Sequence, residues 1–145
     1  MLQIKLHRVF LSSIPERDCY EALYLVKNIN TSNNKVADVK AWTNTGLHFA
    51  EKLKGAIALQ TYRTKGGEEH KQNAVLHLQN ALKYWDVIIS ITRPIYNDMP
   101  LVHYSEQNGV RSKENQLLEF HWEKLRPDVA RDVETAKNAI VVAAR

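Results

Sequence analysis

The chain has 145 residues, of which 44% are hydrophobic, and folding at this length buries roughly 68 to 70% of the chain surface, enough for one domain without disulfides or metals. The single cysteine, Cys19, excludes an internal disulfide and a zinc site built from paired cysteines, so we expect it to pack as a small apolar side chain. The 20 basic and 16 acidic residues are interspersed without a Lys/Arg block, so the net charge of +4 does not predict nucleic-acid binding. No run of about 18 apolar residues occurs, which argues against a membrane span.

The first predicted helix runs from Ser13 to about residue 29. Pro15 is tolerated in a first turn, and the acid Glu16 complements the positive end of the helix dipole. The helix ends where five polar residues, Asn30 to Asn34, favour a turn. Its expected inner face consists of Cys19, Ala22, Leu23, Val26 and Ile29.

The second predicted helix covers residues 36–64. Its apolar and small residues recur at helical spacing and are expected to face the core: Val39, Trp42, Gly46, Phe49, Leu53, Ala56 and Ile57. Gly46 and Gly55 each lower the helix propensity by about 0.8 to 1 kcal/mol relative to Ala, and we interpret them as places where a neighbouring backbone comes close. Gly66 and Gly67 are expected to end the helix.

Residues 68–92 form the third predicted helix and carry the broadest apolar face of the chain. Its stripe consists of Val75, Leu78, Leu82, Trp85 and Ile89, widened by Ala74, Ala81 and Ile88. Pro94 ends this helix, because proline has no N–H to donate and disfavours helical geometry in the residue before it. Trp42 of the second helix and Trp85 of the third are both predicted to be core residues.

Residues 93–119 are predicted to form a long irregular connection, because they hold two prolines and a glycine. A connection of this length in a compact domain tends to be functional or to be packed by its own side chains. The last predicted helix begins at Arg126-Pro127-Asp128 and carries one apolar stripe, made of Val129, Val133, Ala136 and Ile140. The sequence therefore predicts an all-α fold: an antiparallel bundle of about four helices with a long loop before the last helix, in a single domain over residues 1–145.

No motif in the chain predicts a catalytic residue, a metal site or a cofactor. Glu119 and Glu123 stand four residues apart, as two ligands on a helix would, but His121 between them points elsewhere. Asp86 and Asp98 are a conceivable acid pair for glycoside cleavage, and they are explained equally well as surface acids. We therefore expect that this chain alone is not an enzyme.

The spacing Trp42-x2-Thr45-Gly46-x2-Phe49 is also found in tetratricopeptide repeats. The pattern does not recur after the repeat period of about 34 residues, and both predicted helices are longer than the repeat permits. A helical hairpin that packs in a similar way, and that serves as a protein-interaction module, is the alternative function that this spacing leaves open.

Three stretches carry a resemblance to a known family. They are the run Trp42-x6-Phe49-Ala-Glu-Lys-Leu-Lys-Gly-Ala-Ile-Ala-Leu59, the run Ala74-x3-Leu78-x2-Ala81-Leu-x2-Trp85, and Phe120-x-Trp122 with Val129-x2-Asp132-Val-x2-Ala136. Over roughly residues 37–140 the chain resembles the helical C-terminal region of large bacterial proteins, often from gut Bacteroidetes, that are similar to α-glucuronidase-like glycoside hydrolases. In that family the glycosidic chemistry belongs to a barrel domain that is absent from this sequence.

The resemblance implies a non-catalytic accessory domain, a piece of a larger protein, which packs on the parent's catalytic domain and contributes to glycan binding. It implies a periplasmic or secreted location if the parent degrades glycans. It assigns no catalytic role to any residue of this chain, because the family's catalytic residues belong to the barrel domain. The expected glycan contacts lie in the long connection, where aromatic rings would stack on a sugar and arginines would pair with a uronic acid. These candidate ligand-binding residues are Arg93, Tyr96, His103, Tyr104 and Arg111.

Overall fold

The computed structural model of the chain describes residues 16–27, 33–96, 99–100, 103–107, 110–114 and 119–142, with side chains described for 16–27, 34–96 and 120–142. The helices comprise residues 16–26, α2 (Asn33–Lys65), α3 (Glu68–Thr92), the short 3-10 helix η1 (Trp122–Leu125) and α4 (Arg126–Lys137). The strands are β1 (Met99–Pro100), β2 (His103–Gln107), β3 (Val110–Glu114) and β4 (Glu119–Phe120).

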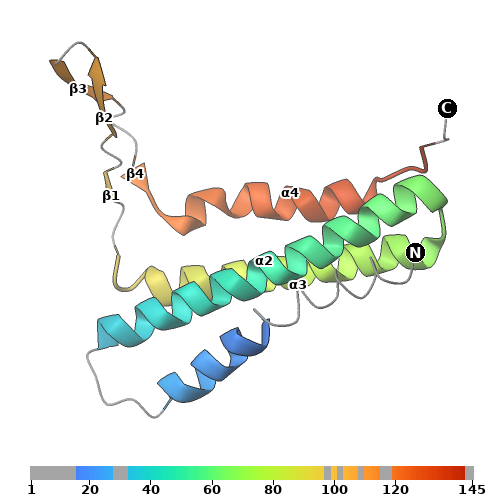
Figure 1. Cartoon of the computed structure of the whole chain (residues 1–145), viewed down its shortest axis with the longest axis horizontal. Helices are drawn as coiled ribbons and strands as arrows, with labels where there is room; N and C mark the ends of the chain where they lie inside the picture. Colours follow the sequence, from blue (N-terminus) through green and yellow to red (C-terminus); the bar gives the residue numbers. More distant parts are fainter. Residues whose placement is uncertain are drawn as a thin grey trace.

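The long helices form the predicted all-α bundle, and contacts between them define its antiparallel course. Glu16 pairs with Lys54 while Cys19 lies against Gly46, so the helix at 16–26 runs antiparallel to α2. α4 likewise runs antiparallel to α3. Arg126 at the beginning of α4 pairs with Asp86 late in α3, and Lys71 early in α3 donates to the carbonyl of Ala139, just beyond the end of α4. Figure 1 shows the helix at 16–26 and α4 on opposite sides of the α2–α3 hairpin.

The turn between α2 and α3 confirms the prediction for the glycine pair. Gly66 and Gly67 have φ values of 72° and 89°, in the left-handed region that side chains with a Cβ rarely adopt. The Gly66 N–H donates to the carbonyl of Tyr62 at 2.8 Å, so it satisfies one of the carbonyls left open at the end of α2. The sequence therefore sets this turn locally.

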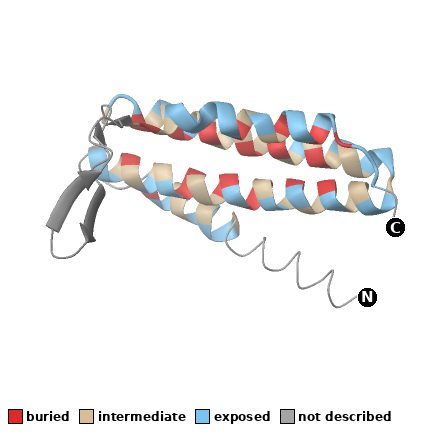
Figure 2. Ribbon diagram, turned by 90° about the horizontal axis from the view of Figure 1, so that it is seen from above, coloured by how far each residue is buried: buried red, intermediate tan, exposed pale blue. Residues whose placement is uncertain are grey.

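The core lies around α3, which packs against both α2 and α4 (Figure 2). It confirms the predicted apolar face of α3, in which Ala74, Leu78, Ala81, Trp85 and Ile88 are buried and Val75, Leu82 and Ile89 are half-buried. One group of buried apolar residues consists of Leu59, Ala74, Leu78, Val133, Ala136 and Ala139, and a second consists of Trp85, Ile88 and Val129. Gly55 confirms the predicted close approach, since a Cβ there would lie 2.7 Å from Leu78 Cγ and 3.3 Å from the Ala74 carbonyl oxygen. At Gly46 the close neighbour is a side chain and not a backbone, since a Cβ there would lie 2.6 Å from Cys19 Sγ.

The predicted inner face of the second helix is wrong. Trp42 is 76% exposed and Phe49 is 61% exposed, while Val39, Leu53 and Ala56 are also exposed and Ile57 is only half-buried. The face that α2 buries instead is richer in polar residues and consists of Ala37, Thr43, Asn44, Leu47, His48, Ala50, Glu51, Gly55 and Leu59.

Hydrogen bonds explain why α2 can bury this polar face. Thr43 Oγ1 donates to the Val39 carbonyl at 2.7 Å and Asn44 Nδ2 donates to the Lys40 carbonyl at 2.8 Å. In the described part of the chain, no buried side-chain nitrogen or oxygen lacks a hydrogen-bond partner. Polar groups satisfied in this way cost little to bury, so hydrophobicity by itself selects the wrong side of the helix.

Two further predictions need correction. α4 ends at Lys137, where the Asn138 N–H donates to the Glu134 carbonyl, so Ile140 lies beyond the helix and is 74% exposed rather than part of its stripe. The connection 93–119 is not wholly irregular, because β1 pairs with β4 and β2 pairs with β3, both antiparallel. The sequence signal for the second pair is Asn-Gly at 108–109, a dipeptide typical of two-residue hairpin turns.

The two tryptophans that the sequence treats alike are expected to differ in their effect on stability. Trp85 is 8% exposed, so Trp85→Ala should cost about 3 to 5 kcal/mol, a large share of the roughly 5 to 15 kcal/mol that stabilises a domain. Trp42→Ala removes an exposed ring and should change stability by about 0.5 kcal/mol or less. Urea unfolding followed by circular dichroism measures both, and equal losses would contradict the orientation of α2.

Candidate functional site

Four exposed apolar residues lie on one side of α2, two on each side of Gly46, and we call them the α2 stripe. Val39 is 40% exposed, Trp42 76%, Phe49 61% and Leu53 49%. Their spacings of three, seven and four place them on one side of the helix. An exposed apolar surface of this kind marks an interaction site more often than an isolated surface residue does.

Packing on both sides holds the α2 stripe in place. On one side the helix at 16–26 reaches α2 through Cys19, which lies against Gly46. On the other side Lys52 Nζ lies 2.7 Å from Asp132 Oδ2 of α4. Beneath the stripe, the buried His48 ring lies edge-on to Phe49, with the two ring centroids 5.4 Å apart, and His48 Nδ1 donates to the Ala81 carbonyl of α3 at 3.0 Å. α2 is therefore held by contacts with three neighbouring helices, while the stripe itself is exposed on its outer side.

A second notable feature is a polar cluster around the buried Glu51, which we call the Glu51 cluster. Glu51 Oε2 accepts from His77 Nδ1 at 2.9 Å and from Asn80 Nδ2 at 3.2 Å, and Oε1 accepts from Lys54 Nζ at 3.0 Å. Lys54 Nζ also donates to Glu16 Oε2 at 2.6 Å. The cluster thus joins α2 to α3 and attaches the helix at 16–26 to both.

The electrostatics of the Glu51 cluster favour its charged form. Burial by itself raises the pKa of the Glu51 carboxyl, but hydrogen bonds from His77, Lys54 and Asn80 outweigh burial and hold the pKa below its ordinary value. Burial lowers the pKa of Lys54, and its bonds to the two carboxylates outweigh that effect and raise the pKa. Within the described residues, no group of three or more His, Cys, Asp or Glu is placed to hold a metal ion.

Tyrosines extend the contact between the helix at 16–26 and α3. The Tyr20 and Tyr84 hydroxyls lie 2.8 Å apart, within hydrogen-bonding distance. Burial, reinforced by the bond to Tyr20, raises the pKa of Tyr84 above its ordinary value. Burial, followed by the charges of Asp18 and Glu16, raises the pKa of the Cys19 thiol. Cys19 is therefore a packing residue, as predicted, and not an activated nucleophile.

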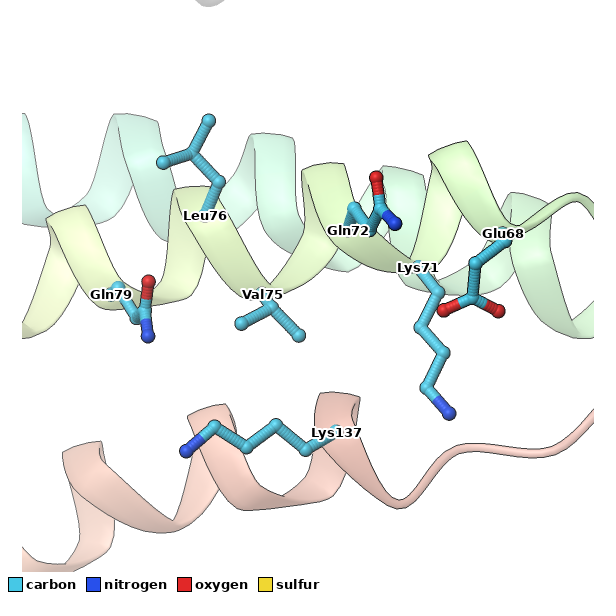
Figure 3. Close-up of a pocket in the computed structure, with 7 residues that line it drawn as sticks. All are labelled: Glu68, Lys71, Gln72, Val75, Leu76, Gln79 and Lys137. Carbon is cyan, nitrogen blue, oxygen red and sulfur yellow. The ribbon is translucent and has the colours of Figure 1, made fainter.

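A groove of about 400 Å³ lies between α3 and α4 (Figure 3). Its lining consists of Glu68, Lys71, Gln72, Val75, Leu76, Gln79 and Lys137. Both amines in it already have partners, since Lys71 Nζ donates to the Ala139 carbonyl at 3.1 Å and Lys137 Nζ donates to Glu134 Oε1 at 2.8 Å. Figure 3 shows Val75 directed toward α4 and Leu76 directed away from it. The groove is a weaker candidate than the α2 stripe.

Two of the five predicted ligand-binding residues have described side chains, and both use their polar groups within the protein. Arg93 Nε lies 3.3 Å from Glu123 Oε2, and the Tyr96 hydroxyl donates to Asp38 Oδ1 of α2. The Tyr96 ring packs against Trp122, with ring centroids 6.1 Å apart. This end of the bundle therefore secures the connection to α2 and η1.

The other three predicted ligand-binding residues have side chains outside the described part of the chain. His103 and Tyr104 belong to β2 and Arg111 belongs to β3, and the register places Tyr104 opposite Lys113. Asp98 also lies outside the described residues. Asp86 is the other member of the conceivable acid pair. Its carboxylate accepts two hydrogen bonds from Arg126, from Nε at 2.6 Å and from Nη2 at 3.1 Å, as expected for a surface acid in an ion pair.

The sequence analysis missed two buried histidines that hold elements together. His121 is fully buried, its Nδ1 accepts from the Glu123 N–H at 3.1 Å, and its Nε2 lies 3.4 Å from Thr92 Oγ1. Burial lowers the pKa of His48, so that ring is neutral while it donates to Ala81. His121 directly precedes η1, and a polar residue at the start of a helix is the sequence signal that predicts such a cap.

Comparison with protein-family models, with characterised proteins and with solved structures finds no match for the chain. None of the helices among the described residues combines the length and the apolar character that crossing a bilayer requires. The candidate site therefore rests on the geometry of this chain, in which Trp42 of the α2 stripe is 76% exposed on a helix whose other face is buried.

Acid is expected to weaken the Glu51 cluster. The pKa of Glu51 in the folded chain lies below its ordinary value of 4.5, so the carboxylate stabilises the fold above that pH and the stabilisation is lost as the pH falls through the folded pKa. Glu51→Gln should remove this contribution. Urea midpoints measured from about pH 7 to about pH 3 should therefore fall less steeply for Glu51→Gln than for the wild type. Identical slopes would contradict the assignment.

Cys19 provides a reporter for the attachment of the helix at 16–26. Lys54→Met removes the amine that bridges Glu16 and Glu51, so the helix should detach more often and the Cys19 thiol should react faster with a disulfide reagent such as DTNB. We expect an increase of about ten-fold, corresponding to a loss of about 1.4 kcal/mol. The control is Arg17→Gln, since Arg17 pairs only weakly with its exposed neighbour Asp18 at 3.3 Å. An unchanged rate in Lys54→Met would show that the bridge does not hold the helix.

Proposed function

We propose that this chain is a non-catalytic helical docking domain that binds another protein surface through the α2 stripe. The observation that carries the proposal is the 76% exposure of Trp42 on a helix packed against its neighbours on both sides. Burying about 150 Å² of such a ring in a partner would contribute roughly 4 kcal/mol at ~25 cal/mol per Å². Tryptophan is also among the residues most enriched at the energetic centres of protein interfaces.

The more specific form of the proposal is an accessory domain of a bacterial carbohydrate-active enzyme, in which the partner surface is the parent's catalytic domain. The resemblance to helical C-terminal regions of α-glucuronidase-like proteins supports this form, and it includes Trp42 and Phe49 of the α2 stripe. The alternative is a tetratricopeptide-like interaction module. Its support is the same Trp42 to Phe49 spacing, although α2 and α3, at 33 and 25 residues, are long for such a repeat.

Glycan contact is a weaker part of the proposal. Arg93 and Tyr96 use their polar groups on Glu123 and Asp38, so binding a uronic acid through them requires these bonds to break. Docking through the α2 stripe requires no such rearrangement. We therefore place protein docking ahead of glycan binding.

Photo-crosslinking in the native host tests the docking function. A benzophenone amino acid at position 42 or 49 should give covalent adducts of discrete mass on irradiation, because these side chains would lie inside the interface. The same probe at position 131, an exposed arginine on α4, is the matched control and should give none. Mass spectrometry of the adducts distinguishes a catalytic domain from another partner. Equal labelling at positions 42 and 131, or labelling at neither, would contradict docking through the stripe.

A further inference from the structure

We infer that the helix at 16–26 regulates docking at the α2 stripe, because it is a releasable cover over the middle of the stripe. This inference rests on the proposed docking function and adds to it a means of control by another segment of the same chain. Three observations lead to it: the spacing of the stripe about Gly46, the position of Cys19, and the contacts that attach the helix at 16–26 to the bundle.

Gly46 is the midpoint of the α2 stripe. With Gly46 included, the residues of this line recur at spacings of three, four, three and four: Val39, Trp42, Gly46, Phe49 and Leu53. Gly46 is half-buried, whereas the four apolar residues are exposed. The reason is Cys19 of the helix at 16–26, whose Sγ lies 2.6 Å from the place that a Cβ of Gly46 would occupy. The helix at 16–26 therefore divides the stripe into two halves.

The helix at 16–26 is attached separately from the main core. The two buried apolar clusters are built from α2, α3, α4 and Ala139. The helix at 16–26 buries Val26, and its other contacts with the bundle include the half-buried Glu16 and Cys19 and the exposed Tyr20. Because a helix of this length is only marginally stable by itself in water, its order depends on these few contacts.

Release of the helix at 16–26 leaves the buried carboxylate of Glu51 satisfied. Lys54 Nζ bridges Glu16 Oε2 at 2.6 Å and Glu51 Oε1 at 3.0 Å, so Lys54 keeps one carboxylate when Glu16 departs. The other two donors to Glu51 are His77 and Asn80, and both belong to α3. The helix at 16–26 can therefore open without leaving a buried charge unpaired in the α2–α3 hairpin.

Opening enlarges the surface that a partner can contact. With the helix at 16–26 in place, a partner reaches the two halves of the α2 stripe but not the backbone at Gly46 between them. Once Cys19 has moved away, the missing Cβ of Gly46 lets a partner approach α2 closely, and the two halves become one line. A partner that prefers this open form will bind it more tightly and will itself shift the helix at 16–26 toward release.

Hydrogen exchange tests the release in the absence of a partner. In the full chain, amides of the helix at 16–26 should exchange at least about ten-fold faster than those of α3. Glu16→Lys places a second cation beside Lys54, so it should accelerate exchange in the helix at 16–26 by a further factor of about ten while leaving α3 unchanged. The matched control is Asp18→Lys, an equal change of charge at an exposed residue of the same helix, whose ion-pair partner is Arg17. It should change the exchange rate by less than about two-fold. Exchange as slow in the helix at 16–26 as in α3 for all three proteins would overturn the inference.

A disulfide between α2 and the helix at 16–26 tests the effect of the cover on docking. In Gly46→Cys, the new Cβ would lie 2.6 Å from Cys19 Sγ, close to the ~3 Å that separates these two atoms in a disulfide. The purified full chain carries the benzophenone amino acid at position 49 and is irradiated in thiol-free extract of the native host. Oxidised Gly46→Cys should give at least about five-fold fewer discrete adducts than the same protein after reduction, because the locked cover excludes the partner from the middle of the stripe. In the matched control, Gly46→Cys with Cys19→Ser, oxidant should not change the yield.

The outcomes separate the cover from the docking function. Equal adduct yields from oxidised and reduced Gly46→Cys would overturn the cover and leave docking through the α2 stripe standing. If neither form of Gly46→Cys nor the wild type gives adducts, the docking function itself is contradicted, even where the exchange rates show that the helix at 16–26 opens. Failure of the disulfide to form under oxidant would show that Cys19 does not lie over Gly46, which would also overturn the inference.

Discussion

The close approach of α2 to α3 at Gly55 is the contact on which the rest of the structure depends. A side chain at this position would overlap Leu78, so the absence of a Cβ allows Leu78 to pack directly against the α2 backbone. The bond from His48 to the Ala81 carbonyl fixes the same pair of helices further along their length. Together these contacts set the rotation of α2 about its own axis, and that rotation directs Trp42 and Phe49 outward.

The two sides of the α2–α3 hairpin are covered by different physical means. α4 packs through the aliphatic residues Val129, Val133 and Ala136, with ion pairs such as Lys52–Asp132 at the edge. The helix at 16–26 buries Val26 and is also attached through polar contacts, the Glu16–Lys54 pair and the two tyrosine hydroxyls. Apolar burial is largely independent of pH, whereas the polar attachment depends on the charge of Glu51 and Lys54. The first helix is therefore the part of the bundle most sensitive to acid.

The titratable groups inside the bundle serve its architecture. His121 caps η1, His48 joins α2 to α3, and the Glu51 carboxylate receives three hydrogen bonds from side chains around it. In each case the polar atoms are directed toward protein partners and not toward a cavity. Among the described residues, the α2 stripe is one of several exposed apolar surfaces, and Trp42 at 76% is its most exposed member.

Local chemistry in the sequence was sufficient to predict much of this fold. Gly66 and Gly67 provide the positive φ values that the α2–α3 turn requires, Pro94 stops α3, and Pro127 begins α4, so these boundaries follow from single residues and their neighbours. The apolar face of α3 was also predictable, because its stripe is broad and no competing face exists.

The orientation of α2 and the candidate site were decided only by the tertiary structure. α2 has two possible inner faces, an apolar one with Trp42 and Phe49 and a mixed one with Leu47, His48 and Glu51, and helical periodicity favours the first. The second is buried because partners from other elements, such as His77 and the Ala81 carbonyl, satisfy its polar groups, and because Gly55 admits Leu78 on that side. Those partners are distant in sequence, so the periodicity of α2 by itself cannot predict that its polar groups will be satisfied.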